Sequence, residues 1–174
     1  MAIAPDGQVL ATGSDDYCFA LWDRRSASML RNWDGRRGEG HSGRVYSVAF
    51  SLDGRCLATG AVDKRAKLWD LRQQRCLACE SHEDLVNCVT FSPSGLVLSA
   101  CDRGSVVVWT AEGETLATYC HPDAVLSASF ADDGQLATGC RDGTIRLWSG
   151  EAELLNANVE TKGCDIKSVC FIPT

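Results

Sequence analysis

The sequence is poor in the features that mark nucleic-acid-binding and membrane proteins. Its 174 residues carry 17 Lys and Arg against 23 Asp and Glu, a net charge of −6, so there is no overall positive charge to attract phosphate groups. No apolar run approaches the ~18 residues of a membrane span, and residues 1–7 lack the basic start of a signal peptide. These absences predict an intracellular protein, cytoplasmic or nuclear, with no membrane association and with nucleic acid as a disfavoured partner.

Metal and redox motifs are also scarce, although the chain has ten cysteines. Cys76 and Cys79 form the only C-x-x-C pair, and His82 alone does not supply the second pair of ligands that a zinc site needs. Cys88 and Cys101 lie in or next to apolar stretches, where a free cysteine serves as a small buried hydrophobe. We therefore expect structural cysteines, no metal and no cofactor.

An internal repeat is the dominant feature of the sequence. Four of the five tryptophans recur at spacings of 47, 40 and 39 residues, and each follows Leu or Val. A hydroxyl residue lies ten positions before each tryptophan, and all three histidines lie 27 or 28 positions before one. The aligned residues are Trp22, Trp69, Trp109 and Trp148, the hydroxyl residues Thr12, Thr59, Ser99 and Thr138, and the histidines His41, His82 and His121. A period of about 40 residues is typical of a repeat architecture.

Each repeat predicts four short strands. In the second repeat, residues 45–50 form a first strand, whose apolar positions change phase as a β-bulge would require. A turn with Asp53-Gly54 leads to a second strand over 56–60, and a third strand ends at Trp69. A weaker fourth strand covers 74–79. In the third repeat, residues 106–109 are apolar on both faces, which favours a sheet stacked between neighbouring sheets.

These residues resemble the WD-repeat β-propeller family. The resemblance is carried by Gly40-His41, Val45 to Phe50, Leu57 to Gly60, Asp63 and Leu68-Trp69-Asp70, and it extends over nearly the whole chain. It implies an all-β fold of four-stranded antiparallel blades around a central channel, with the first strand of each blade innermost.

The resemblance also implies a hydrogen-bond network in which the tryptophan indole contacts the hydroxyl, the hydroxyl the histidine, and the histidine a turn aspartate. Two repeats carry the full set: His41, Thr59, Asp63 and Trp69, and His121, Thr138, Asp142 and Trp148. The third has His82, Ser99 and Trp109, but Arg103 replaces the aspartate, and Asp102 is a replacement acceptor if the turn shifts. The first has Thr12, Asp16 and Trp22 without a histidine.

A hydroxyl, a histidine and an aspartate also make up a hydrolase triad. The same trio recurs in successive repeats, its hydroxyl is tied to a tryptophan, and the sequence has no nucleophile elbow. We therefore interpret the network as structural and expect no enzymatic activity.

The repeats predict four nearly complete blades and an incomplete ring. The blades are expected at about 1–35, 41–80, 82–119 and 121–158, and the first strand of a fifth blade at about 165–174. Four blades are fewer than the seven or so with which the family usually closes. We expect a fragment of a longer propeller or a half that pairs with another chain, because open blade edges associate. Self-association or further blades would then complete the ring.

The favoured function is a scaffold that presents one propeller face to proteins or peptides. By analogy, the residues near the channel mouth lie just before the first strand of a blade and just before the turn aspartate. The partner-binding candidates there are Arg44, Tyr46, Asn87, Arg141, Asp15 and Asp102, of which Tyr and Arg are frequent hot-spot residues.

Two alternatives stay open. Trp22-Asp23-Arg24-Arg25 and Trp69-Asp70-Leu71-Arg72 resemble the box of substrate receptors of cullin-RING ubiquitin ligases, in which Arg25 and Arg72 would contact the ligase adaptor. Residues 24–44 carry six arginines around Trp33, which would suit an RNA-associated propeller if Trp33 stacked on a base. The simpler interpretation of that segment, which we favour, is a solvated insertion with Trp33 packed on the blade edge.

Overall fold

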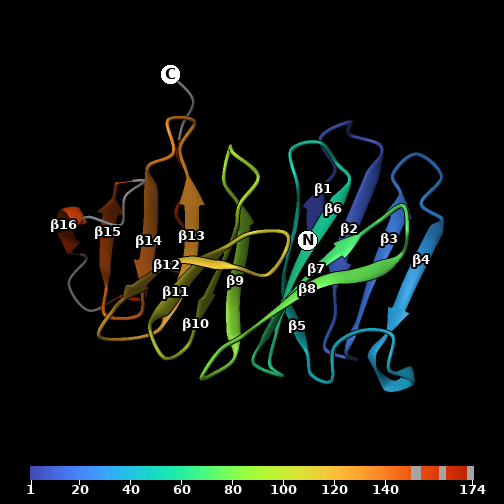
Figure 1. Ribbon diagram of the computed structural model, residues 1–174, viewed down its shortest axis with the longest axis horizontal. Coiled ribbons are helices and arrows are strands. Elements are labelled where there is room, and N and C mark those ends of the chain that lie inside the picture. Colours follow the sequence, from blue (N-terminus) through green and yellow to red (C-terminus); the bar gives the residue numbers. More distant parts are fainter. Residues whose placement is uncertain (150–153, 161–163, 172–174) are drawn as a thin grey trace.

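The computed structural model describes residues 1–149, 154–160 and 164–171, the second of these for its backbone alone. Within these residues the chain forms four separate sheets, each of four antiparallel strands that follow one another in sequence order (Figure 1). The predicted all-β fold of four-stranded blades is therefore confirmed. We number the sheets as blades one to four.

The strand bounds show how closely the blades repeat. Blade one has β1 (Ala2–Ile3), β2 (Val9–Gly13), β3 (Cys18–Asp23) and β4 (Met29–Asp34), and blade two has β5 (Val45–Phe50), β6 (Cys56–Ala61), β7 (Arg65–Asp70) and β8 (Arg75–Ser81). Blade three has β9 (Val86–Phe91), β10 (Val97–Cys101), β11 (Ser105–Trp109) and β12 (Thr115–Cys120), and blade four has β13 (Val125–Phe130), β14 (Leu136–Cys140), β15 (Thr144–Trp148) and β16 (Leu154–Glu160).

The first hairpin of blade two is set by an Asp-Gly turn. Between β5 and β6, Gly54 has a φ of 69°, a left-handed conformation that a residue without Cβ adopts at little cost. The Asp53 carboxylate accepts a hydrogen bond from the Arg55 backbone N–H at 3.0 Å, which closes the turn. The turn thereby fixes the register in which Phe50 pairs with Leu57.

The core lies between the blades rather than within one sheet. Blades one and two enclose a cluster that includes Phe19, Trp33, Leu57 and Trp69, and corresponding clusters lie between blades two and three and between blades three and four. The strand β11, apolar on both faces, is buried throughout its valine run at 106–108. This stacking explains why such strands do not alternate between apolar and polar residues.

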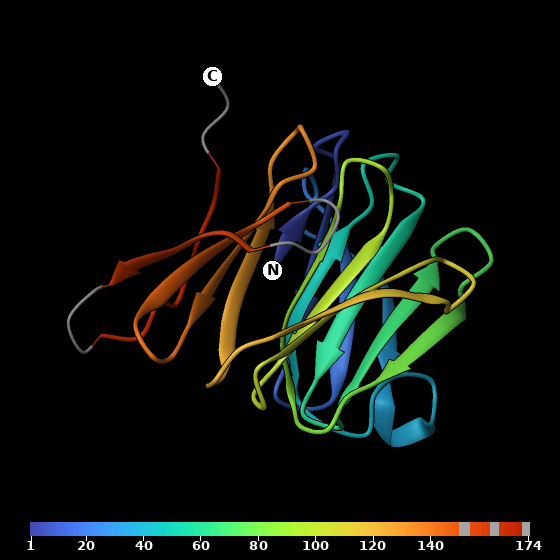
Figure 2. The ribbon, with the colours of Figure 1, turned by 60° about the vertical axis from the view of Figure 1, so that its left-hand side comes forward.

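The first strands of neighbouring blades lie side by side, as Figure 2 shows for the stacked sheets. The predicted bulge is present, since the β5–β6 register shifts between Val45 and Ser47. A matching shift occurs in β13 between Val125 and Ser127. The bulge turns both Val45 and Val48 into the interior, where they are 3% and 8% exposed, although they are three residues apart.

Glycines on the second strands allow neighbouring blades to approach closely. A Cβ atom on each of three glycines would lie 2.5 to 2.8 Å from a side-chain atom of the next blade or segment, a distance at which atoms overlap. The three pairs are Gly13 with Val45, Gly60 with Val86 and Gly139 with Ile166. The repeat therefore uses small residues on the second strand to seat the following first strand.

The predicted first strand of a fifth blade, over residues 165–174, is not formed within the described residues 164–171, and residues 172–174 lie outside the description. A strand requires a neighbouring strand to pair with, and none is found beside this segment in the described chain. Ile166 nevertheless donates its backbone N–H to the Cys140 carbonyl at 3.1 Å. Val45 makes the equivalent bond to Ser14 at 3.0 Å, so Ile166 occupies the position at which a new blade begins.

The seven extra residues behind the 47-residue spacing form an ordered connection. A 3₁₀ helix (Gly35–Arg37) begins after Asp34, whose carboxylate accepts from the Arg36 backbone N–H at 2.9 Å. Trp33 is 2% exposed and stacks on Phe19 with ring centroids 4.7 Å apart. The expectation that Trp33 packs on the blade edge is therefore confirmed.

The four blades form an open arc. Blade one and blade four lie at opposite ends of the row of sheets (Figure 1), in agreement with the expected incomplete propeller. Among the residues described, no helix has the length and apolar character that would suit a membrane crossing.

Candidate functional site

Blade two contains a continuous chain of hydrogen bonds from a tryptophan to an aspartate. The Trp69 indole N–H donates to Thr59 Oγ1 at 2.8 Å, and Thr59 Oγ1 lies 2.6 Å from His41 Nε2. His41 Nδ1 lies 2.9 Å from Asp63 Oδ2. A carboxylate only accepts, so it places a proton on Nδ1, and Nε2 of the neutral ring then accepts from the Thr59 hydroxyl. Each group in the chain is thereby both oriented and satisfied.

Asp63 is the charged end of this chain. Burial by itself would raise the pKa of its carboxyl, but the hydrogen bonds from His41 and from the Ser42 and Arg65 backbone N–H groups outweigh burial and hold the pKa below its usual value. The Ser42 N–H donates to Asp63 Oδ2 at 2.9 Å. Asp63 thus joins the blade's second turn to the segment that enters β5.

Burial prevents the Thr59 hydroxyl of this hydrogen-bond network from acting as a nucleophile. Thr59 is fully buried, and the His41 and Asp63 side chains are 0% and 5% exposed. The Thr59 hydroxyl accepts from one side and donates to the other, so no substrate carbonyl reaches it. The arrangement holds β6, β7, the turn between them and the segment before β5 in one geometry, and it offers no route for acyl transfer.

Blade three lacks the acceptor at the end of the chain. The Trp109 indole N–H donates to Ser99 Oγ at 3.1 Å, and His82 Nε2 lies 2.7 Å from Ser99 Oγ. His82 Nδ1 is buried with no hydrogen-bond partner among the described residues, and Arg103 is exposed. Burial lowers the pKa of His82, although the charge of Glu80 raises it.

The suggested replacement acceptor in blade three, Asp102, does not reach His82. Asp102 instead accepts from Asn87 Nδ2 at 3.1 Å and pairs with Arg141 of blade four, with Nη2 and Oδ1 2.6 Å apart. Arg141 binds both carboxylate oxygens, a geometry that guanidinium favours. The expectation that Asp102 substitutes for the missing aspartate is therefore wrong, because a stronger partner in the next blade holds it.

The prediction that Asp142 accepts a hydrogen bond from His121 in blade four is wrong. The Trp148 indole donates to Thr138 Oγ1 at 2.9 Å and His121 Nε2 lies 2.8 Å from the same oxygen, as in blade two. However, His121 Nδ1 donates to the Gly104 carbonyl of the blade-three turn at 3.2 Å. Asp142 forms no hydrogen bond with His121, and Arg146 binds its carboxylate at 3.0 Å instead.

These neighbours shift two pKa values in blade four. Burial, together with the positive charge of Arg146, lowers the pKa of His121 to about 4, so the ring is neutral at neutral pH. Burial by itself raises the pKa of Asp142, but its hydrogen bonds with Thr144 and Arg146 lower it further than burial raises it. The blade therefore has a neutral histidine and a separate ion pair instead of one continuous chain.

Blade one has the tryptophan and hydroxyl but no histidine. The Trp22 indole donates to Thr12 Oγ1 at 2.9 Å, and Asp16 accepts from the Cys18 backbone N–H at 3.0 Å. Hydrogen bonds from Ser14 and Cys18 lower the pKa of Asp16. Asp16 thus stabilises the β2–β3 turn in which it lies.

The partner-binding candidates divide into two groups. Asn87, Asp102 and Arg141 are bound to one another, and Asn87 also donates to the Val125 carbonyl at 3.1 Å, so this group joins blades three and four. The sequence signal that was overlooked is an Asp and an Arg at the same turn position of neighbouring repeats. The remaining candidates, Arg44, Tyr46 and Asp15, stay exposed.

The exposed group lies on blades one and two. Tyr46 is 47% exposed on β5 between two inward-facing valines. Arg44 and Asp15 have side chains that are 56% and 76% exposed, and their charged atoms are 3.9 Å apart. So long and exposed an ion pair is weak, which leaves both charges available to a partner.

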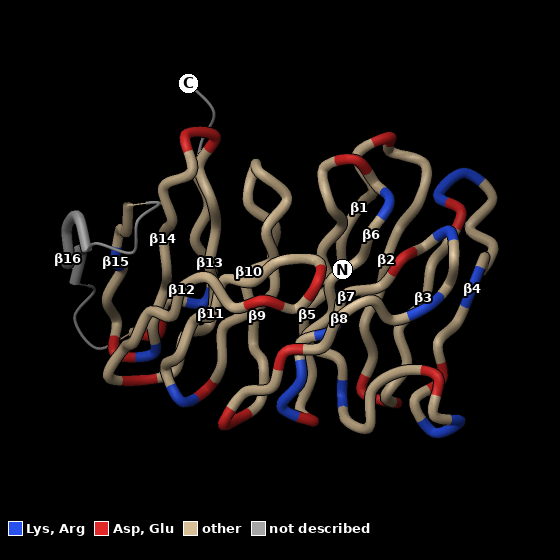
Figure 3. The backbone as a smooth tube through the Cα atoms, in the orientation of Figure 1, with Lys and Arg blue, Asp and Glu red and all other residues tan. Residues whose placement is uncertain are grey.

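Two further features bear on the alternatives. Arg25 and Arg72 follow the third strands of blades one and two, are exposed, and form no ion pair within the described part of the chain. Figure 3 shows basic residues on β4 and the turn before it. Trp33 lies inside the blade-one cluster, however, and cannot stack on a base, so the RNA interpretation loses its aromatic element.

Four stacked four-stranded sheets, each with a tryptophan bonded to a hydroxyl ten residues before it, define a propeller-type repeat protein. The family model described as "WD domain, G-beta repeat" matches residues 1–23, 35–70, 73–110 and 113–149. The chain therefore belongs to the WD40 repeat family. No curated protein sequence matches the chain. Domains of this family generally serve as non-catalytic scaffolds that bind other proteins.

Proposed function

We propose that this protein is a non-catalytic scaffold that binds a protein or peptide through the surface formed by Asp15, Arg44 and Tyr46. The observation that carries the proposal is that Tyr46 is exposed on the inner strand β5, while Val45 and Val48 of the same strand are buried. A rigid strand presents the ring in a fixed orientation, so little conformational entropy is lost when a partner covers it.

The charges beside Tyr46 favour a partner with both acidic and basic groups. Arg44 and Asp15 come from adjacent blades and are only loosely paired, so a partner that pairs with each of them separately displaces a weak contact. The corresponding residues of blades three and four already satisfy one another. A partner would have to break those bonds, and we therefore place the binding surface on blades one and two.

The experiment compares partners captured by matched variants. Tyr46→Ala and Arg44→Glu are expected to lose the partners that the wild type retains in quantitative affinity purification. Arg55→Glu is the control, because Arg55 is 84% exposed in the turn at the other end of β5 and makes the same charge change. Equal capture by all three variants would place the binding surface elsewhere.

A narrower candidate is the substrate receptor of a cullin-RING ligase. It is supported by Arg25 and Arg72, two exposed arginines at the same position of adjacent blades. Direct binding to a purified ligase adaptor, lost in Arg25→Glu/Arg72→Glu and retained in Arg44→Glu, would establish this role. Absence of binding by the wild type would reject it.

We also propose that further blades, from another part of a polypeptide or from a second copy, complete the ring. The support is the open arc of the four sheets and the seating of Ile166 on Gly139 as Val45 is seated on Gly13. Stacked blades are covered on both faces, so the outer faces of an open arc favour association. Sedimentation velocity at micromolar concentration tests this proposal, and a stable monomer of the 174-residue chain would contradict it.

A further inference from the structure

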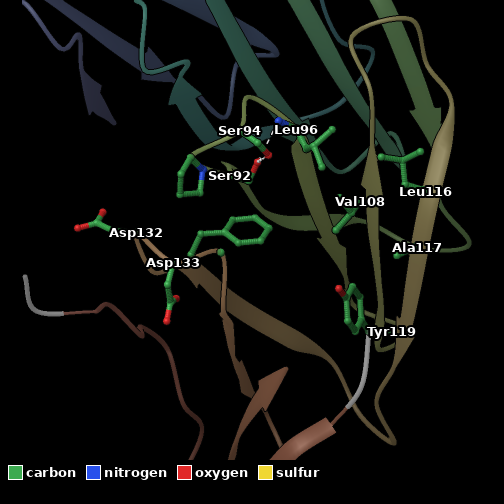
Figure 4. Close-up of a pocket in the computed structure, with 12 residues that line it drawn as sticks. Ser92, Ser94, Leu96, Val108, Leu116, Ala117, Tyr119, Asp132 and Asp133 are labelled. Atoms are coloured by element: carbon green, nitrogen blue, oxygen red, sulfur yellow. Dashed lines mark hydrogen bonds between the residues drawn. The ribbon is translucent and has the colours of Figure 1, made fainter. Parts of the chain in front are cut away.

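A groove with a volume of about 460 Å³ lies between blades three and four (Figure 4). Its walls come from the β9–β10 turn, from β11 and β12, and from the β13–β14 turn. Apolar side chains line most of it, including Leu96, Val108 and Phe130. Leu116 at its side is 52% exposed, which leaves a large apolar surface open to solvent.

The groove also contains a polar group that has no hydrogen-bond partner among the described residues. Tyr119 is 4% exposed, and its hydroxyl end is turned toward the groove in Figure 4. No described residue forms a hydrogen bond with this hydroxyl, although the ring packs edge-on against Trp148 with centroids 4.9 Å apart. Burial raises the pKa of Tyr119, so the hydroxyl keeps its proton and can donate to an incoming acceptor.

Acidic side chains form one edge of the groove. Asp132 and Asp133 occupy the β13–β14 turn, which is acidic in Figure 3. Asp133 accepts from the backbone and side chain of Gln135. Asp132 is exposed and has no ion pair among the described residues, which leaves its charge for a cationic group.

The repeat supplies an internal comparison. A smaller groove of about 180 Å³ lies between blades one and two and is lined by the equivalent residues Leu21, Leu30, Phe50 and Asp53. There, Asp53 is bonded to Ser51 and lies 3.7 Å from Arg55, and Leu52 occupies the position of Asp132. The groove between blades three and four is thus the larger of the two, and within the described residues it is the one whose acid and hydroxyl have no partner.

We propose that the groove between blades three and four binds a short extended peptide segment of a partner protein that carries an aliphatic side chain next to a Lys or Arg. The aliphatic side chain covers Leu116 and fills the space above Phe130. A backbone carbonyl of the peptide accepts from the Tyr119 hydroxyl, and the basic side chain pairs with Asp132.

An extended segment fits because β12 is the outer strand of its sheet, and an outer strand leaves backbone groups available to a chain that lies along it. The β13–β14 turn is at the opposite end of its strands from the mouth where Arg141 and Asp102 meet. This site is therefore separate from the surface around Tyr46, and either can fail without the other.

The test begins with a displayed library of random ten-residue peptides, selected on the full 174-residue chain after depletion on Leu116→Glu. We expect enriched peptides to share an aliphatic residue within three positions of Lys or Arg. An enriched peptide labelled with fluorescein should bind Leu116→Glu at least about tenfold more weakly than the wild type. Asp132→Asn should weaken binding roughly threefold to tenfold, by an amount that shrinks at high salt.

Tyr119→Phe separates recognition from structure. Because the hydroxyl has no partner in the described chain, its removal should leave the denaturation midpoint unchanged while weakening peptide binding about threefold to fivefold. Tyr46→Ala and Leu30→Glu are matched controls and should bind the peptide like the wild type. The proposal is overturned if no peptide is enriched, if the enriched peptides lack basic residues, or if Leu116→Glu and Tyr119→Phe bind them as tightly as the wild type.

Discussion

Replacing Arg103 by Asp should stabilise blade three. In blade two the equivalent Asp63 accepts from His41 Nδ1 at 2.9 Å and from the Ser42 backbone N–H at 2.9 Å. In blade three the corresponding ring atom, His82 Nδ1, is buried without a partner in the described chain. An aspartate at position 103 would provide that partner by the geometry that blade two already uses.

The magnitude follows from opposing contributions. A buried polar group left without a hydrogen bond costs about 1–3 kcal/mol. The new carboxylate would lie beside Asp102 and would lose rotamer freedom, which offsets part of this gain. Because Asp102 is already neutralised by Arg141, we expect a net stabilisation of about 1 kcal/mol, or roughly 2–4 °C in Tm for a domain of this size.

The assay is reversible urea denaturation of the wild type, Arg103→Asp and Arg103→Ala. The alanine variant removes the arginine without adding an acceptor and should lie within about 0.5 kcal/mol of the wild type. Burial lowers the pKa of His82, so the unfolded chain takes up its proton first and the wild type loses stability as pH falls below about 6.5. The aspartate raises that pKa, so its benefit should be larger at pH 5.5 than at pH 8. If Arg103→Asp is no more stable than Arg103→Ala at either pH, the unpartnered His82 nitrogen is not a source of instability.

Three further perturbations test the network and the packing. Trp69→Ala should cost about 3–5 kcal/mol in urea denaturation, because it empties the core between blades one and two and removes the indole donor to Thr59; a loss below about 1 kcal/mol would contradict its burial. His121 has its pKa lowered to about 4, so stability should fall by about 3 kcal/mol between pH 6.5 and pH 4. His121→Gln should flatten that part of the curve, and an unchanged slope would assign the effect to other groups. Gly35→Ala places a Cβ against the His41 carbonyl and should lower Tm by several degrees. An unchanged Tm would show that the 3₁₀ segment can shift to accommodate the methyl group at little cost.

Several sequence predictions succeeded because the features concerned are local. The spacing of Trp22, Trp69, Trp109 and Trp148 located every blade, since each blade is a chain-order meander held by short turns. The matched repeat at 73–110 contains β8 of blade two and β9–β11 of blade three. The sequence repeat is therefore offset from the sheet by one strand, yet its period still counts the blades.

The residues that face another blade could not be assigned in this way. His121 and Asp142 lie 21 residues apart, one fewer than His41 and Asp63 in blade two. Arg146 on the following strand binds Asp142, and His121 donates instead to the Gly104 carbonyl of the preceding blade. Asp102 likewise pairs across the blade boundary with Arg141. Spacing within one repeat says nothing about competitors that a neighbouring repeat provides.

The sequence by itself determined the number of blades and their strands, because these depend on turns and alternation within about 40 residues. The tryptophan–hydroxyl contacts followed from the resemblance to the WD-repeat family. The tertiary structure alone decided which acceptor each histidine has, which charges stay free, and where a groove remains between blades. Those outcomes depend on side chains from different blades that meet only when the sheets stack, and hydrogen bonds and ion pairs are decided by the nearest competing partner.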